Sequence, residues 1–583
     1  MAEHTWLRRR TPAAAVLLAL LTLLVFLPAL RNGFVFDDRE YILDNPAVRQ
    51  GLTLEGAAWA LTAFHAANWH PLTWLSHMID VSLFGLAPSG HHLTSVAIHA
   101  LAASALFLAL SRLTGAFWGS LLAASLFALH PLRVEPVAWA AARKHVLAAG
   151  LLSLTLLAWQ RHLSRPAPGR YLAALALFAL GLAANPMLAI LPALLLLLDW
   201  WPLGRFPLGQ AGRGGARWLV EEKIPFLVLS CAAAVLAFTA QFSGRNLSSL
   251  SDLPLGPRLA NAVNSGAAYL VYAAWPTRLS FFYEYPLGGI PPWRLGLSAL
   301  FLAAITALVV RERRLRPWLA VGWGWYLVTL LPVAGLIQIG AQGMADRYAY
   351  IPLVGPFLAG SLWLAELCTE RCPLRLPASL LAGTAVLACA LLAVRQTGFW
   401  RDEVSLWTRA LEVAGESSMA HNHLGLALEK QGRAQDAEGH YRAALRLAPD
   451  HGEALGNLGA LLAAGGRFQE AVGFLARAVT LVPASAVYRN NLGLALHLLG
   501  RQAEARASLE EALRLDPGYP EAHNNLGLIL VAEGRLEAAE AEFRRAVDLR
   551  EGYAEARSNL GRVLLALEAR SRRASAGSVR DGH

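Results

Sequence analysis

The sequence predicts an all-α membrane protein, in which a polytopic bundle of about eleven transmembrane helices precedes a solenoid of helical repeats. Three observations support this fold class. The 583 residues are 55% hydrophobic and 16% charged, with a mean hydropathy of +0.40, which is too apolar for an ordinary soluble protein. Long runs of Leu, Ala, Val and Phe end near Arg395. Beyond that residue the sequence repeats itself every 34 positions.

Apolar segments long enough to span a membrane fill the N-terminal part of the chain. A crossing helix needs roughly 20 apolar residues, and we predict spans at 13–30, 92–110, 115–130, 146–160, 171–185, 186–201, 224–241, 295–310, 318–338, 350–367 and 377–394. The first span follows three arginines and lacks a convincing cleavage site. We therefore interpret it as a retained anchor with a cytoplasmic N-terminus.

Basic residues between the spans agree with this orientation. Counting alternately from a cytoplasmic N-terminus places the basic loops 161–170, 205–223 and 311–316 on the cytoplasmic side. The agreement requires the Asn185-Pro186 break to separate two short helices, and the apolar stretch 262–282 to be re-entrant or interfacial. We expect the protein in the cell (inner) membrane. An odd number of spans then places the chain beyond Arg395 on the extracytoplasmic side.

The C-terminal repeats have the period and the small residues of tetratricopeptide repeats (TPRs). Leu-Gly pairs recur from Leu424-Gly425 to Leu560-Gly561. The glycines expected to end each first helix are Gly432, Gly466, Gly500 and Gly534. The alanines expected where helices cross are Ala437, Ala471, Ala505 and Ala539, and those expected to pack the second helix are Ala444, Ala478, Ala512 and Ala546. We predict a transmembrane domain at 1–395, a connector and capping helix at 396–417, four full repeats plus a cap at 418–567, and a disordered tail at 568–583.

Asn457, Asn491, Asn525 and Asn559 recur at one position of the first helix of each repeat. A carboxamide offers one acceptor and two donors, so a ladder of carboxamides on the concave face would bind the backbone of an acceptor peptide. The alternative is that these asparagines support packing between repeats, and the sequence leaves both interpretations open.

Two adjacent carboxylates, Asp37 and Asp38, follow the first span at the start of the first outer loop, 31–91. In a partly desolvated site, one carboxylate could accept a proton from an incoming hydroxyl while its neighbour orients the substrate or a cation. The alternative is a solvated pair that ends a helix.

Further polar residues are expected on the same outer side. Arg143, Lys144 and Arg347 are candidates to bind the phosphate of a lipid-linked donor. Ionisable groups at membrane depth are costly unless they line a polar cavity, and on this ground we expect a cavity that includes His130, Glu135 and Asp346.

Other function classes find little support in the sequence. The net charge of +10 does not indicate nucleic-acid binding, because many basic residues lie in short loops between spans. We predict no metal site. The cysteines Cys231, Cys368, Cys372 and Cys389 lack ligand spacing, and the histidines His70, His91, His92 and His99 lack a carboxylate partner at such spacing.

Several motifs taken in order resemble a known family. They are FVFDD at 34–38, NWHPLTWLSHMID at 68–80, ALHPLRVEPVAW at 128–139, NPML at 185–188, PALLLLLDWWPLG at 192–204 and MADRYAYIPLVG at 344–355. With the repeats that follow, they resemble the transmembrane-and-TPR family of protein O-mannosyltransferase-like proteins. This resemblance covers nearly the whole chain.

The resemblance implies a fold like the C-type glycosyltransferases and a polyprenyl-phosphate sugar, mannose first, as donor; a divalent metal requirement stays open. Asp37 and Asp38 match the acidic pair of the first outer loop, one of them being the general base for a Ser or Thr hydroxyl. Attack on the anomeric carbon would displace the lipid phosphate with inversion. That leaving group is a stable anion, so no strong general acid is required.

Two positions depart from the family pattern. Bacterial relatives typically have Glu-Arg-Lys-Asp where this chain has Ala142-Arg143-Lys144-His145, and Lys-Pro-Met where it has Asn185-Pro186-Met187. An acid and a base are replaced together, so we infer that positions 145 and 185 pair across two helices in relatives, and that their joint loss avoids a single buried charge.

Three functions are compatible with the sequence. The first is a glycosyltransferase that modifies extracytoplasmic proteins, with the TPR array presenting the acceptor. The second is a non-catalytic membrane-anchored TPR scaffold for envelope proteins, and the third is a polysaccharide ligase with the same donor. The expected partners are the lipid bilayer, a lipid-linked sugar and protein or peptide acceptors. Asp37 and Asp38 favour an enzyme, because a scaffold does not require them.

Overall fold

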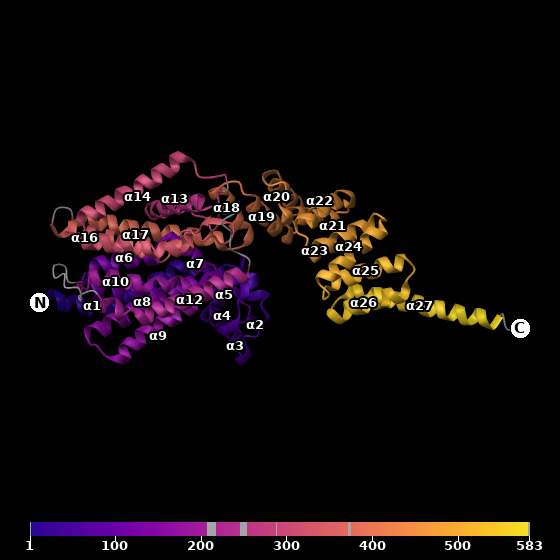
Figure 1. Ribbon diagram of the computed structural model, residues 1–583, viewed down its shortest axis with the longest axis horizontal. Helices are drawn as coiled ribbons and strands as arrows, with labels where there is room; N and C mark the ends of the chain where they lie inside the picture. Colours follow the sequence, from indigo (N-terminus) through magenta and orange to yellow (C-terminus); the bar gives the residue numbers. More distant parts are fainter. Residues whose placement is uncertain (1, 207–216, 245–252, 287, 371–374, 581–583) are drawn as a thin grey trace. The chain divides into compact units, whose positions relative to one another are not determined.

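A computed structural model describes residues 2–206, 217–244, 253–286, 288–370 and 375–580, most of which are α-helical (Figure 1). The chain divides into two compact units, Met1–Ala414 and Gly415–His583. The predicted fold class is confirmed, since an apolar helical bundle is followed by helical repeats.

The first unit is built around apolar helices. These are α1 (Ala2–Phe26), α5 (Pro88–Thr114), α6 (Phe117–Leu129), α8 (Arg143–Ser164), α9 (Pro168–Ala184), α10 (Leu191–Trp200), α12 (Ile224–Ser243), α14 (Pro292–Glu312), α15 (Pro317–Leu330), α16 (Val354–Glu370) and α17 (Arg375–Thr397). Within the described residues, six helices are long and apolar enough to cross a membrane, and α6 with the bent segment Pro131–Ala138 makes a seventh. Shorter apolar helices coincide with the remaining four predicted spans.

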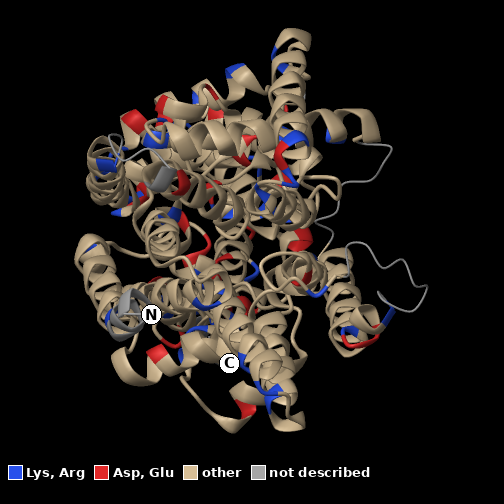
Figure 2. Cartoon of the chain, turned by 90° about the vertical axis from the view of Figure 1, so that its left-hand side faces the viewer, with Lys and Arg blue, Asp and Glu red and all other residues tan. Residues whose placement is uncertain are grey.

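Several of these helices expose their apolar side chains. Only 6% of the most apolar window of α14 is buried, against 72% for the segment Ala140–Ser164 that contains α8. Most of the ribbon in Figure 2 is tan, which reflects how few charged residues the bundle carries. Exposed apolar helices around a buried helix are the arrangement expected of a bundle surrounded by lipid.

Shorter elements complete this unit. They are α2 (Pro46–Arg49), α3 (Leu54–Thr62), α4 (Pro71–Phe84), α7 (Val134–Ala138), α11 (Arg217–Glu221), α13 (Leu255–Ala274), α18 (Glu403–Ala414), β1 (Tyr283–Glu284) and β2 (Gln342–Met344), the two strands pairing antiparallel. Helix α13 overlaps the stretch 262–282 and buries Arg258, Asn261 and Asn264. It is not among the apolar spans found in the described part of the chain. Its polar face accords with the interpretation of this stretch as re-entrant or interfacial, which stays a prediction.

An ion-pair network connects the end of α10 with the start of α12. Lys223 Nζ lies 2.5 Å from Asp199 Oδ2, and Arg205 binds both Asp199 Oδ1 at 2.8 Å and Glu222 Oε2 at 2.9 Å. Lys223 and Asp199 are both buried, so removal of either would leave the other as a buried charge with one ion-pair partner fewer. The network therefore joins the chain on both sides of residues 207–216.

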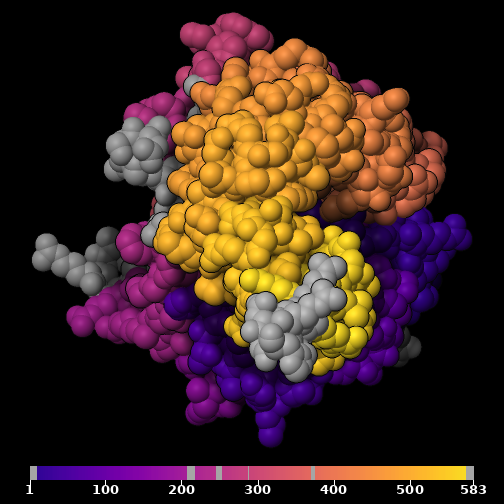
Figure 3. Space-filling view, turned by 90° about the vertical axis from the view of Figure 1, so that its right-hand side faces the viewer, coloured from indigo at the N-terminus to yellow at the C-terminus, as the bar shows by residue number. Residues whose placement is uncertain are grey.

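The second unit consists of four helix pairs and a final helix. They are α19 (Ser418–Lys430), α20 (Ala434–Leu447), α21 (Gly452–Ala464), α22 (Phe468–Leu481), α23 (Ala486–Leu498), α24 (Gln502–Leu515), α25 (Pro520–Ala532), α26 (Leu536–Leu549) and α27 (Ala554–Arg580). Gly432, Gly466, Gly500 and Gly534 have φ between 75° and 79°, which ends each first helix as predicted. Figure 3 faces this unit, and neighbouring colours lie side by side, as in repeats that contact their neighbours.

Small residues allow the paired helices to approach closely. The eight alanines predicted at the crossings are fully buried. A Cβ atom on Gly425 or Gly459 would come within 2.6 Å of Tyr441 or Leu475 on the second helix of the same repeat. Helix α27 continues to Arg580, into the segment for which we predict a disordered tail. The residues there include Ala, Glu and Arg, which favour a helix, and no proline.

Candidate functional site

Asp37 lies on a strained turn just after α1. The preceding residue, Phe36, has φ of +51°, a conformation that bulky residues rarely adopt. Its ring packs against Trp139, Phe281 and Trp407 with centroid distances of 6.0, 5.8 and 5.5 Å. A π-helical turn, Arg39–Leu43, follows directly. Strained residues and π-helical turns occur often at functional sites, and here they leave the Asp37 side chain half-buried.

Asp38 has a different environment from its neighbour. Its carboxylate is fully buried, and its two oxygens accept hydrogen bonds from the backbone N–H of Val35 at 3.0 Å and of Ala141 at 2.6 Å. The second bond joins the turn after α1 to the segment that begins α8. Asp38 therefore fixes the turn on which Asp37 is presented.

Burial raises the pKa of both carboxyl groups. The pKa of Asp37 is raised to about 6 by burial, although the charges of Arg347 and Lys144 lower it. The pKa of Asp38 is raised to about 7 by burial, against the two backbone hydrogen bonds, while the charge of Asp37 raises it further. A carboxyl group with a pKa near 6 is poised to exchange a proton near neutral pH.

Lys144 and Arg347 are the predicted basic residues whose charges reach Asp37. Lys144 is half-buried and donates a hydrogen bond to the Tyr41 hydroxyl at 3.3 Å. Arg347 pairs with Glu135 and has its guanidinium over the ring of Trp139, 5.2 Å from the centroid. The structure thus brings one acid and two predicted phosphate-binding cations to the same region.

The residues predicted to line a cavity are buried, each with polar partners. His130 uses both ring nitrogens, one bonded to the Ala273 carbonyl at 3.0 Å and the other to the Leu132 N–H at 3.2 Å. Asp346 accepts a hydrogen bond from the Tyr283 hydroxyl at 3.0 Å, and Glu135 binds Arg347. These side chains therefore hold the β1–β2 and α6–α7 segments around Arg347, and none of the three is exposed.

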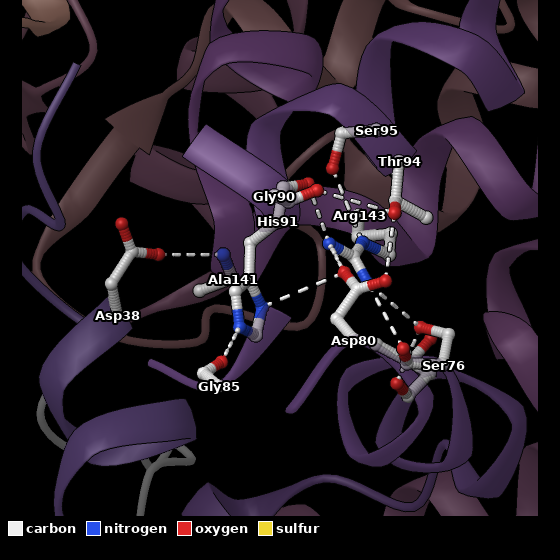
Figure 4. Close-up of polar contacts among 11 residues, drawn as sticks. Asp38, Ser76, Asp80, Gly85, Gly90, His91, Thr94, Ser95, Ala141 and Arg143 are labelled. Atoms are coloured by element: carbon white, nitrogen blue, oxygen red, sulfur yellow. Dashed lines mark hydrogen bonds and ion pairs between the residues drawn. The ribbon is translucent and has the colours of Figure 1, made fainter. Parts of the chain in front are cut away.

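Arg143 lies in a closed polar cluster between α4, α5 and α8 (Figure 4). Its guanidinium is fully buried, lies 2.5 Å from Asp80 Oδ2 and donates to the His91 carbonyl at 2.7 Å and to Ser95 Oγ at 3.1 Å. These contacts leave no exposed face for a donor phosphate. The acid that pairs with Arg143 is Asp80, which is not among the residues singled out from the sequence, because it lies on a different helix far away in the chain.

Asp80 also corrects the interpretation of His91. Asp80 Oδ2 lies 3.5 Å from His91 Nδ1, so this histidine does have a carboxylate neighbour. The two residues belong to different helices, α4 and α5, and are brought together by the turn at Gly85. Sequence spacing within one helix could not reveal this pair.

Of the four cysteines, Cys372 lies outside the described residues.

Positions 145 and 185 lie side by side in this chain, while the acid–base pair that we infer for relatives stays a prediction. Asn185 Nδ2 lies 3.4 Å from His145 Nδ1, across the boundary between α9 and α8. Two neutral side chains thus meet where relatives are expected to place an acid and a base. Their joint replacement avoids a single buried charge.

The asparagines of the repeats pair with one another between adjacent repeats. Asn457, Asn525 and Asn559 donate to Asn422 at 3.0 Å, Asn490 at 2.8 Å and Asn524 at 2.8 Å, respectively. The acceptors form a second asparagine series, one residue earlier in the repeat. Asn491 has no such acceptor because Gly456 stands at the corresponding position. These bonds use part of the hydrogen-bonding capacity that a peptide would need.

Comparison with known proteins finds a repeat family for the C-terminal part of the chain and relatives that cover most of its length. Residues 390–450, 424–486, 482–520, 490–554 and 524–571 match the family described as Tetratricopeptide repeat. Protein O-mannosyl-transferase TMTC1 of Homo sapiens is 25% identical over 499 residues, covering 75% of this chain and 56% of that protein. Protein O-mannosyl-transferase TMTC4 of Homo sapiens is 26% identical over 475 residues, covering 70% and 63%. The resemblance stated from the motifs is confirmed.

The chain spans less than two thirds of the length of these relatives. Among solved structures, MamA from Desulfovibrio magneticus RS-1 is 23% identical with a TM-score of 0.24, covering 26% of this chain and 85% of that one.

Proposed function

We propose that this chain, a relative of the transmembrane-and-TPR protein O-mannosyl-transferases, transfers a sugar from a polyprenyl-phosphate donor to serine or threonine hydroxyls of extracytoplasmic proteins. The observation that carries the proposal is Asp37, a half-buried carboxylate with a raised pKa on a strained turn near Lys144 and Arg347. An ordinary solvated acid would need neither the strain nor the nearby cations.

The reaction balances with the residues at hand. The acceptor hydroxyl oxygen forms a bond to the anomeric carbon of the sugar, and Asp37 accepts the hydroxyl proton. The bond between that carbon and the phosphate oxygen breaks, and the lipid phosphate leaves with the electron pair. Lys144 and Arg347 would hold this phosphate before and after transfer. Attack opposite the leaving group inverts the anomeric configuration.

The other predicted residues support this chemistry from a distance. Asp38 positions the turn, while Arg143, through Asp80, joins α8 to the helices of the outer loop. We assign Arg143 this positioning role in place of the donor contact expected from the sequence. The TPR array would present the acceptor protein.

A transfer assay tests the proposal directly. Purified protein is incubated with radiolabelled polyprenyl-phosphate mannose and a Ser/Thr-rich peptide, and labelled peptide is counted. We expect transfer by the unaltered chain and none when donor or peptide is omitted. A folded protein that transfers no sugar from any polyprenyl-phosphate donor would leave the membrane-anchored scaffold as the better assignment.

A further inference from the structure

Three side chains with metal-ligating atoms meet beside Arg143. They are His77 and Asp80 of α4 and His91 at the start of α5, and one ligand atom of each lies within 4.8 Å of the others. All three are buried, with exposed fractions of 0%, 1% and 0%. The mechanism proposed above uses none of them as a reacting group.

The hydrogen bond of His91 determines what its other nitrogen presents. His91 Nε2 lies 3.2 Å from the Gly85 carbonyl, which can only accept, so Nε2 carries a proton. In a neutral ring, Nδ1 then presents a lone pair. That lone pair faces Asp80 Oδ2 at 3.5 Å, an atom that is also rich in electrons. Two such atoms repel each other unless a cation or a proton lies between them.

The surroundings of His77 independently indicate that a cation binds here. Neither of its ring nitrogens has a hydrogen-bond partner in the described part of the chain, although the side chain is fully buried. Its ring stacks on that of His91 with centroids 5.9 Å apart and an interplanar angle of 25°. A buried polar group without a partner is costly, and a bound cation would provide that partner.

We propose that His77, Asp80 and His91 bind a divalent transition-metal ion, zinc in first place. Two imidazoles and one carboxylate are ligands that zinc accepts, with a fourth position for water. The ligands are themselves oriented as in metal sites, because His91 donates its second N–H to a backbone carbonyl and Asp80 Oδ1 accepts from Thr94 Oγ1 at 2.7 Å.

Arg143 sets the strength of this site. Its guanidinium binds Asp80 Oδ2, the same oxygen that would bind the metal, and its positive charge repels a metal ion there. The guanidinium also donates hydrogen bonds to Ser95 Oγ and to the His91 carbonyl. It stays in place when the carboxylate turns toward the metal. The ion would then tie α4 to α5 next to α8, the helix that carries Lys144. Its role is therefore to fix the outer loop near the proposed transfer site.

Metal analysis of the purified full-length chain in detergent tests the proposal. We expect about one zinc ion per chain after extensive dialysis, and loss of the ion in His77→Ala and in His91→Ala. His99→Ala is the matched control. His99 is also a buried histidine of α5, but Tyr350 and the Ala128 carbonyl occupy both of its ring nitrogens at 2.6 and 2.9 Å. It should retain the metal.

A second measurement covers the case in which the variants fail to fold. Chelator-treated unaltered protein should take up Co²⁺ with visible d–d absorption bands, lose those bands on addition of Zn²⁺, and unfold at a higher temperature with either metal. Unaltered protein that neither contains nor takes up a metal would overturn the proposal and leave a shared proton between His91 and Asp80. Full metal content in His77→Ala would also overturn it. Neither readout depends on sugar transfer.

Discussion

At the level of single residues, Asp37 and Asp38 are adjacent in sequence but have different surroundings. The sequence indicates that an acidic pair follows the first span, because two carboxylates there are not explained by packing. The sequence cannot indicate which carboxylate binds the backbone, because the N–H group that binds Asp38 belongs to Ala141, which is far away in the sequence. The same limit applies to Arg143, whose partner Asp80 lies on another helix.

The two aspartates should therefore respond differently to the same substitution. Asp37→Asn should lower the transfer rate by about 10² to 10⁴ with little change in thermal stability, because the amide cannot accept the hydroxyl proton. In Asp38→Asn the new NH₂ group would face a backbone N–H, and an unsatisfied buried donor costs about 1–3 kcal/mol. We expect this variant to unfold at a lower temperature. Equal loss of stability in both variants would contradict the division of roles.

Transfer should also depend on pH in a defined direction. Burial raises the pKa of Asp37 to about 6, so its carboxyl group becomes protonated as the pH falls through that value. A protonated base cannot accept the hydroxyl proton, and kcat/KM should fall about tenfold per pH unit below that point. The measurement is a pH profile of kcat/KM with saturating donor lipid. A rate that increases toward low pH would instead assign Asp37 as an acid.

At the level of elements, apolar runs predict the membrane helices well. Each of the eleven predicted segments coincides with an apolar helix, because lipid exposure requires long uninterrupted apolar sequence. The helices α2, α3 and α4 of the outer loop have no such run and were not predicted. Within the repeats, the predicted glycines and alanines lie where the backbone turns and helices pack, while the last helix extends beyond the predicted cap to Arg580.

The interrupted asparagine series makes the repeat packing testable. Gly456 replaces an asparagine, and a Cβ atom there would lie 2.3 Å from the ring of Tyr488, which itself replaces an alanine. Gly456→Asn alone should overpack this contact and destabilise the array by about 1–3 kcal/mol.

Adding Tyr488→Ala should recover much of that loss, because the introduced asparagine could then accept from Asn491 as in the other repeats. Hydrogen exchange of α21 and α23 in the full chain measures the effect. Gly439→Ala, at a glycine with open space around it, is the control. If the double variant exchanges as fast as the single variant, the two sites are not coupled.

At the level of the whole molecule, the orientation in the membrane depends on the number of crossings and on which loops are basic. With α13 not crossing, the odd number of spans predicts that the repeats are extracytoplasmic. Alkaline phosphatase fused after Arg395 or at the C-terminus should be active in a bacterial host. A fusion within 311–316 should be inactive. The reverse pattern would show that one more or one fewer segment crosses.

The ion-pair network around Asp199 has a consequence for how the chain is connected. Asp199 and Arg205 lie before residues 207–216, Glu222 and Lys223 after them, and their charges already hold the two sides together. The peptide link between α10 and α11 should thus be dispensable. Residues 1–210 and 211–583, produced as separate polypeptides in one cell, should assemble and co-purify without any covalent bond. Lys223→Ala should lower the yield of co-purified pieces, because only the Arg205–Glu222 pair then joins the two sides, and the same substitution should leave the uncut protein in the membrane.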